Sequence, residues 1–206
     1  MQSSRYYRLL LVCLVPFAQV CAQSAWSLKK DKDGIRIYTR TGNESRFNEL
    51  RAVFDLRGNF TQLRAILQDV PHYKDWVYCT KSSMPVKRLS SQEMIYYSEV
   101  SVPWPLSNRD FYGDTRIWID SVKNQLLVSS RNVDQVYPPN EGLVRIPYLR
   151  AEWVVSTPSP GQLHVDYTLS WNPGGGVPAW MANLFSINGP FQSFSQLKRK
   201  MALLNP

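Results

Sequence analysis

Residues 163–204 decide the fold, and they read LHVDYTLSWNPGGGVPAWMANLFSINGPFQSFSQLKRKMALL. Apolar and polar side chains alternate over 163–171, which is typical of a strand with one buried face. Pro178 follows the glycines at 174–176 and favours the first turn of a helix. From there apolar residues recur every three or four positions as far as Leu204. The stretch therefore predicts a half-buried strand that leads through a short turn into one long C-terminal helix.

The same alternation occurs repeatedly upstream. It is clear at 50–56, where every second residue is apolar. Further strands are predicted at 35–39, 94–102, 110–119, 126–131 and 151–155. Short connections rich in Gly, Pro and Asn separate the segments. Because about seven strands follow one another with such short links, we predict a largely antiparallel sheet with one buried face.

One other helix is predicted. Asn59 is a good N-cap, apolar residues repeat at helical spacing over 60–70, and Pro71 ends the pattern. No repeat or linker divides the chain, so we expect a single domain. Its sheet must cover its apolar face with the C-terminal helix, because that is the only long apolar helix in the sequence.

The N-terminus predicts export. A short positive region is followed by an apolar run at 9–18 and by small residues around Ala22. The apolar run is about half of the roughly 20 residues that a transmembrane helix needs, and it contains Pro16. We therefore interpret 1–22 as a signal peptide and 23–206 as the mature domain, and we expect the protein in the periplasm or outside the cell.

Few residues offer chemistry. The net charge of +8 suits nucleic acid or an anionic membrane surface, but export argues against nucleic acid as a partner. After the signal peptide the Cys and His residues are Cys79, His72 and His164, too few and too scattered for a zinc site or a hydrolase triad. The glycines at 174–176 lack the Lys-Ser/Thr of a phosphate loop. We expect no metal, no cofactor and no catalytic residue.

The most distinctive segment is 102–112, VPWPLSNRDFY. Prolines on both sides of Trp104 stiffen the link between two predicted strands, and Arg109-Asp110 opens the second strand. Adjacent strand residues point to opposite faces. If Asp110 faces solvent, Arg109 faces the interior, where a cation is costly unless it is paired, and Glu99 is a candidate partner. The alternative is a surface ion pair at the end of a strand.

Several motifs together resemble the START domain family, the lipid-transfer module of the helix-grip superfamily. They are 72–76 (HYKDW), 103–110 (PWPLSNRD), 142–146 (GLVRI) and 171–180 (WNPGGGVPAW). The motifs occur in family order, and the resemblance covers about residues 26–204.

The resemblance implies an α+β, helix-grip fold, in which a curved antiparallel β-sheet wraps around a long C-terminal α-helix with a tunnel between them. It implies that the domain binds a lipid or sterol-like molecule there without catalysis, and it favours Arg109 over Asp110 as a ligand contact. Familiar members work inside cells, so sterol specificity is not inferred for an exported chain. We also expect transient contact with a membrane surface, and a monomer.

The predicted ligand contacts come from the strand faces and from the helix stripe. They are Tyr97, Glu99, Arg109, Tyr167, Leu169, Trp171, Trp180 and Phe191.

Two alternatives remain open. Helix-grip relatives include polyketide cyclases and dehydratases, and an enzyme of that kind could use Tyr97, Glu99 and Arg109 as polar groups in the same cavity. The other alternative is an envelope protein that sequesters or senses an apolar ligand without transferring it.

Overall fold

The computed structural model describes residues 25–42, 47–133 and 137–204. The predicted signal peptide therefore lies outside the described residues. The described chain forms a 10-stranded sheet and two α-helices, with a short 3-10 helix between α1 and β4. The strands are β1 (Ser27–Lys32), β2 (Ile35–Thr41), β3 (Asn48–Arg57), β4 (Thr80–Arg88), β5 (Glu93–Val100), β6 (Arg109–Asp120), β7 (Gln125–Asn132), β8 (Val144–Arg145), β9 (Tyr148–Ser159) and β10 (Gln162–Asn172). The helices are α1 (Phe60–Gln68), the 3-10 helix η1 (Val70–Asp75) and α2 (Ala179–Leu203).

The sheet is open and antiparallel along its main path. Its strand order is β1-β2-β3-β10-β9-β7-β6-β5-β4, so β1 and β4 are the edges. The short strand β8 pairs in parallel with the first two residues of β6, a part of β6 to which the β7 ladder does not extend. This arrangement brings Arg145 opposite Asp110.

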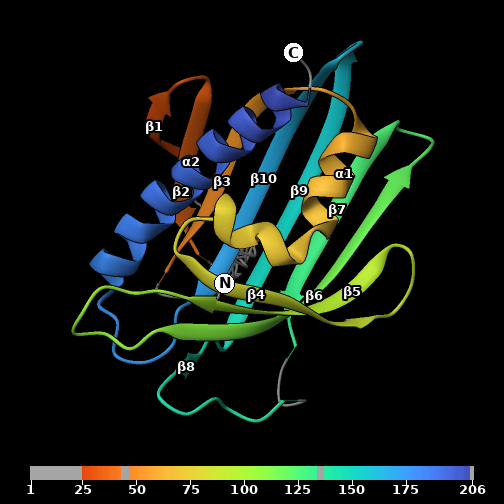
Figure 1. Ribbon diagram of the computed structural model, residues 1–206. Coiled ribbons are helices and arrows are strands. Elements are labelled where there is room, and N and C mark those ends of the chain that lie inside the picture. Colours follow the sequence, from red (N-terminus) through yellow and green to blue (C-terminus); the bar gives the residue numbers. More distant parts are fainter. Residues whose placement is uncertain (1–24, 43–46, 134–136, 205–206) are drawn as a thin grey trace, which may run out of the picture.

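Both α-helices lie on one side of the twisted sheet (Figure 1). Helix α2 packs against β2 and β3, whereas η1 packs against β4 near the other edge. Phe194 of α2 stacks on Phe54 of β3 with ring centroids 4.5 Å apart, and its ring also meets the edge of Trp153 of β9. The middle strands thus face a space that is bounded by α2 on one side and by η1 on the other.

The predicted fold class, α+β with an antiparallel sheet against a long C-terminal helix, is confirmed. Every strand and both helices predicted from the sequence are present. Asn59 caps α1 as predicted: its side chain accepts a hydrogen bond from the Gln62 backbone N–H at 3.0 Å, and the Gln62 side chain accepts one from Asn59 at 3.1 Å. Within the described part of the chain, neither α-helix is both long and apolar enough to cross a membrane.

The sequence did not predict β1, β4 or β8. Both β1 and β4 are edge strands whose residues are mostly exposed, so they need no apolar alternation. Strand β4 also contains Pro85, which is tolerated at a sheet edge but argues against a strand in sequence reasoning. Strand β8 has two residues, too few for any periodicity.

Gly113 provides a test of how tightly the inner face is packed. It pairs directly with Tyr96 across the β5–β6 ladder, and a Cβ at Gly113 would lie 2.6 Å from Cε1 of the Tyr96 ring. That ring is held at its edges by Tyr73 and Phe111, so it has little room to move. We predict that Gly113→Ala lowers the free energy of unfolding by about 1–3 kcal/mol, measured by urea denaturation. The control is Gly176→Ala, where a Cβ would meet nothing within 4 Å. Equal effects of the two substitutions would contradict this packing.

Candidate functional site

A cavity of about 300 Å³ lies between the inner face of the sheet and α2. Its volume is in the range of small-molecule sites in proteins. Large apolar side chains form most of its wall; among them are Trp76, Phe111, Trp153, Leu169, Phe185 and Phe194. Among the described residues that line it, none is Asp or Glu. The wall is therefore apolar, with isolated polar groups and no negative charge from the described side chains.

Strand β6 gives the cavity its length. Arg109, Phe111 and Thr115 all line the cavity, because residues separated by an even number of positions in a strand point to the same face. Arg109 and Thr115 are six residues apart, which corresponds to about 20 Å along an extended strand. The cavity therefore extends along β6 and has different polar groups toward its two ends.

Hydroxyl groups gather at the Thr115 end. Thr115 Oγ1 hydrogen-bonds Ser130 Oγ of the neighbouring strand β7, and both residues are buried. The phenol of Tyr96 interacts with both hydroxyls, and burial raises the pKa of Tyr96 to about 12. This phenol is thus neutral at physiological pH and can donate or accept a hydrogen bond. These groups are polar but uncharged, and all of them contact the cavity.

Three predicted residues of β10 line the cavity, as the strand pattern indicated: Tyr167, Leu169 and Trp171. Burial raises the pKa of Tyr167, so its phenol remains neutral. The indole N–H of Trp171 donates to Ser186 Oγ of α2 at 2.8 Å, which ties the helix to the sheet. Whether these residues touch a ligand remains a prediction.

Arg109 faces the cavity. The residue is 4 % exposed, and burial lowers the pKa of its guanidinium. Its Nη1 donates to the carbonyl oxygen of Ser107, and its Nε has no partner among the described residues. This is a cation in a mostly apolar environment with few of its donors used.

The predicted pairing of Arg109 with Glu99 is wrong. Glu99 instead accepts hydrogen bonds from Lys81 Nζ at 2.8 Å and from Asn108 Nδ2 at 3.0 Å, and it does not line the cavity. The reason is register: Glu99 lies directly opposite Asp110, and directly opposed residues share a face of the sheet. The ion pair with Lys81 and the hydrogen bond from Asn108 lower the pKa of Glu99.

Tyr97 lies on the same outer face as Glu99. Its ring packs on Tyr112 with centroids 5.1 Å apart, and its hydroxyl accepts a hydrogen bond from Asn140 at 3.2 Å. The sequence predicts Tyr97 at the ligand together with Glu99 and Arg109, but Tyr97 shares the outward face of β5 with Glu99. In the structure Tyr96 lines the cavity and Tyr97 does not.

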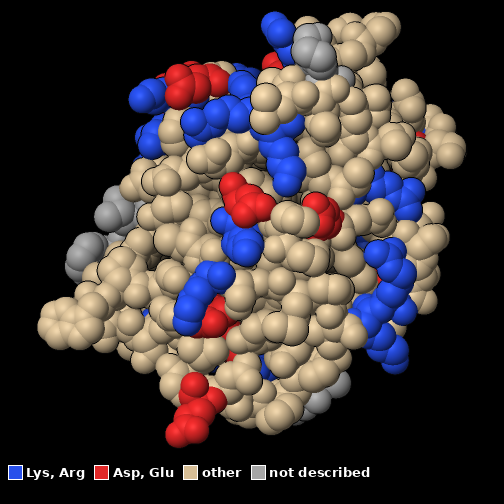
Figure 2. All heavy atoms as spheres, in the orientation of Figure 1, with Lys and Arg blue, Asp and Glu red and all other residues tan. Residues whose placement is uncertain are grey.

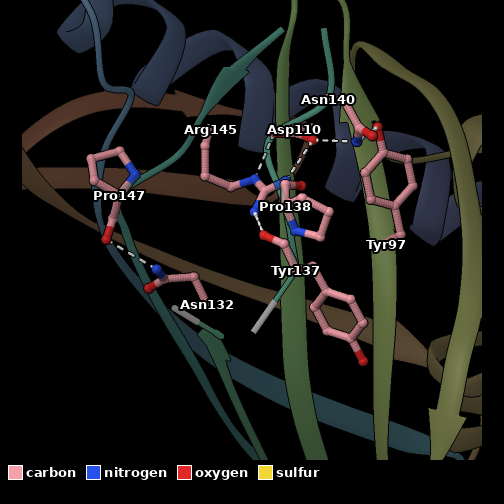
Figure 3. Close-up of polar contacts among 8 residues, drawn as sticks. All are labelled: Tyr97, Asp110, Asn132, Tyr137, Pro138, Asn140, Arg145 and Pro147. Carbon is pink, nitrogen blue, oxygen red and sulfur yellow. Dashed lines mark hydrogen bonds and ion pairs between the residues drawn. The ribbon is translucent and has the colours of Figure 1, made fainter. Parts of the chain in front are cut away.

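Asp110 is fully buried on the outer face, so the premise that it faces solvent is also wrong. Arg145 binds both of its carboxylate oxygens, at 2.8 and 3.1 Å, and Asn140 donates to it at 2.7 Å (Figure 3). Arg145 also donates to the carbonyl oxygens of Tyr137 and Pro138. This network, together with the parallel pairing of β8, fastens the segment before β8 over the start of β6.

The other two predicted residues are on α2. The side chain of Trp180 lies outside the described part of the structure. Phe191 is not among the cavity-lining residues; it packs against the core, with Lys30 Nζ 3.9 Å from its ring centroid. The apolar stripe of α2 is wider than the cavity, because its residues that face β2 and β3 are as apolar as those that face the cavity. Phe191 can therefore belong to the stripe without lining the cavity.

Sequence reasoning missed several cavity residues, among them Trp76, Tyr96, Phe111, Thr115 and Ser130. A signal for two of them was present: once Arg109 is placed inward, period two also places Phe111 and Thr115 inward. Trp76 follows a 3-10 helix and has no periodic signal. Its Nε1 is buried and has no hydrogen-bond partner in the described structure.

Helix α2 makes a second polar contact beside the cavity, with the segment before β4. The backbone N–H of Tyr78 donates to Ser193 Oγ at 2.9 Å, and Ser193 in turn donates to the Gly189 carbonyl. Gly189 allows the close approach, because a Cβ there would lie 3.2 Å from Cδ1 of the Tyr78 ring. Gly189 and Pro190 both line the cavity.

Comparisons with known proteins agree with this architecture. Residues 19–204 match the START domain. The phosphatidylcholine transfer protein of Mus musculus is 26% identical over 186 residues, which cover 84% of this chain and 86% of that protein. A STAR-related lipid transfer protein fragment from Xanthomonas axonopodis has a TM-score of 0.79 at 28% identity, covering 86% of this chain and 98% of that chain. Human StAR-related lipid transfer protein 5 shares the fold with a TM-score of 0.76 at 14% identity, covering 91% of this chain and 90% of that chain.

The Asp110–Arg145 pair makes a prediction about stability. Asp110→Ala leaves the Arg145 guanidinium without its carboxylate, and the loss of one partner of a buried pair is costly. We predict that the free energy of unfolding, measured in urea, falls by about 3 kcal/mol. The control is Glu152→Ala, which removes a more exposed carboxylate paired with Arg150 and is expected to change stability by less than about 1 kcal/mol. If Asp110→Ala lowers the free energy of unfolding no more than Glu152→Ala does, the network does not hold the segment before β8 in place.

Proposed function

The chain belongs to the START domain family, and from this membership we propose that it binds a lipid in the cavity beneath α2 and transfers it between membranes without catalysing a reaction. The observation that carries the proposal is the cavity itself, which is mostly apolar and is bounded by the sheet and by α2. Transfer of a methylene group out of a membrane costs about 0.8 kcal/mol, so a 16-carbon chain costs about 13 kcal/mol. A covered apolar cavity can offset that cost, whereas a surface groove leaves much of the chain in water.

The relatives support the same function. The mouse relative is a phosphatidylcholine transfer protein, and the relative from Xanthomonas axonopodis is a STAR-related lipid transfer protein. Each is similar to this chain over most of its length. These relatives support lipid binding and transfer in general, whereas the class of lipid depends on the residues of this chain's own cavity.

Entry of a lipid requires the cover to move. Among the described residues that line the cavity, two hydrogen bonds join α2 to the rest of the domain: from the Trp171 indole to Ser186, and from the Tyr78 backbone to Ser193. Pro190 lies between these serines and has no N–H to donate within the helix. We infer that α2 moves near Gly189 and Pro190 to admit the lipid.

An enzyme of the cyclase or dehydratase kind is the less favoured alternative. Of the three polar residues predicted for such an enzyme, Tyr97 and Glu99 point to the outer face of the sheet. Arg109 alone of these three lines the cavity. The remaining alternative, sequestration without transfer, differs in one measurable property, which is the exchange of lipid between membranes.

Membrane contact is proposed at the β5–β6 loop. Val102 lines the cavity, and Trp104, two residues further on, is 92% exposed. The loop, residues 101–108, has no charged side chain and forms the uncharged projection at the lower left of Figure 2. Tryptophan favours the membrane interface. The predicted signal peptide at 1–22 supports a periplasmic or extracellular location for this contact.

The transfer proposal is tested by filling the cavity. Ala151 of β9 is buried and lines the cavity, so Ala151→Trp places a large side chain where the lipid is expected. We predict at least a tenfold loss of the rate at which the protein moves labelled phospholipid from donor to acceptor vesicles. The control is Val154→Trp, on the same strand but 41% exposed, which should retain transfer. If the wild-type protein transfers no lipid, the proposed function is ruled out. If Ala151→Trp transfers lipid as fast as the wild-type protein, the cavity is ruled out as the site.

The membrane contact is tested separately. Trp104→Ser removes an exposed indole, so stability should not change, while binding to vesicles should weaken roughly tenfold, the loss expected when one large apolar side chain no longer inserts. Val122→Ser is the matched control. It is 95% exposed in the β6–β7 turn, at the end of β6 remote from Arg109. Cosedimentation with vesicles measures both variants, and equal losses would mean that membrane contact is not confined to the β5–β6 loop.

A further inference from the structure

The charge of the ligand can be argued from Arg109. Its guanidinium remains charged in proteins, and a buried charge needs a partner of opposite sign. The described residues that line the cavity include no carboxylate. Within the described structure, the side chain makes one hydrogen bond, to the Ser107 carbonyl, and its Nε has none. One neutral carbonyl does not balance a positive charge.

The neighbouring carboxylates cannot serve as this partner. Asp110 is next in sequence but lies on the opposite face of β6, where Arg145 and Asn140 occupy its oxygens. Glu99 shares that outer face and pairs with Lys81. Both acids are thus separated from Arg109 by the sheet, and both already have cationic partners.

The other unpartnered polar atom in the cavity wall is also a donor. Among the described residues, three buried side-chain atoms lack a hydrogen-bond partner: Trp76 Nε1, Arg109 Nε and Asp114 Oδ1. Trp76 and Arg109 line the cavity, whereas Asp114 does not. An indole N–H and a guanidinium can only donate. The unpartnered polar atoms of the described cavity wall are therefore both donors, and a negatively charged group of the ligand would supply acceptors for them.

We propose that the lipid carries an anionic oxygen group, a carboxylate or a phosphate, that binds Arg109 while its apolar chain lies along the inner face of β6. This inference rests on the proposed function. Carboxylates and phosphates fit the planar guanidinium through paired hydrogen bonds. The apolar chain passes Phe111 toward Thr115, about 20 Å away, where the hydroxyls are neutral. Arg109 thus selects acidic lipids over neutral ones with the same chains.

Matched lipids test the proposal without any substitution. Delipidated wild-type protein is incubated with vesicles that contain equal amounts of two lipids, then repurified, and the bound lipid is quantified by mass spectrometry. One pair is oleic acid and oleyl alcohol, which share a chain and differ in charge. The other is phosphatidic acid and diacylglycerol. Preference in both pairs shows that either anion suffices, whereas preference in one pair alone identifies the carboxylate or the phosphate as the ligand group.

We expect the acidic member to be bound roughly tenfold or more in excess, as hydrogen bonds to a charged group would give. Arg109→Met should reduce this preference to near unity. Arg109→Lys, which keeps the charge but loses the planar fork, should restore part of it. Arg116→Met is the control for net charge: Arg116 is on the same strand but exposed, so the preference should be unchanged.

The stability of the lipid-free variants separates ligand recognition from a structural role. Removal of an unpaired buried cation should leave the melting temperature of Arg109→Met equal to or above that of the wild-type protein. A lower melting temperature together with an unchanged lipid preference would assign Arg109 a structural role and overturn the proposal. Equal uptake of acidic and neutral lipids by the wild-type protein would also overturn it but leave the proposed function intact. No uptake of any lipid would instead refute the proposed function, and this inference with it.

Discussion

The ion pair between Asp110 and Arg145 fixes the start of β6 in the register on which the cavity depends. Arg109 and Asp110 lie on opposite faces of one strand, and among the described residues Asp110 has a charged partner whereas Arg109 has none. Because Asp110 is held on the outer face by Arg145 and Asn140, Arg109 must point inward. The same register places Phe111 and Thr115 in the cavity wall. A shift by one residue would move Asp110 into the cavity and would leave the site with the opposite charge.

The cavity is left unfilled because two separate elements, α2 and η1, pack on different parts of the sheet. Helix α2 packs on β2 and β3, and η1 packs on β4, so neither fills the space over the middle strands. Phe194 and Trp153 pack together beneath α2, whereas the hydroxyls of Ser186 and Ser193 join the helix to Trp171 and to the backbone of Tyr78. Helix α2 is therefore held both by apolar contacts and by a few hydrogen bonds. Such an arrangement suits a helix that must open for a lipid and then close again.

Much of the fold could be predicted from the sequence, because alternation and helical spacing report which faces are buried. The strand at 163–171, the cap at Asn59 and the start of β6 at Arg109 are all confirmed. The edge strands β1 and β4 gave no such signal, since they are mostly exposed. The site was harder to predict, because its residues depend on which face of each strand is inward. Either Tyr96 or Tyr97 could face the cavity as far as the sequence shows. The register of β5 against β6, in which Glu99 lies opposite Asp110, places Tyr97 on the outer face and Tyr96 on the inner one.

The central claim is that the cavity holds a lipid and that Arg109 requires this lipid to be acidic. Native mass spectrometry of the protein, purified from cells without detergent or added lipid, tests it most directly. The account predicts a species heavier than the polypeptide by the mass of one lipid, which is released on denaturation and is identified in negative-ion mode as a fatty acid or an acidic phospholipid. A protein that carries only neutral lipid would contradict the assignment to Arg109. A protein that has the bare polypeptide mass and yields no extractable lipid would contradict the account as a whole.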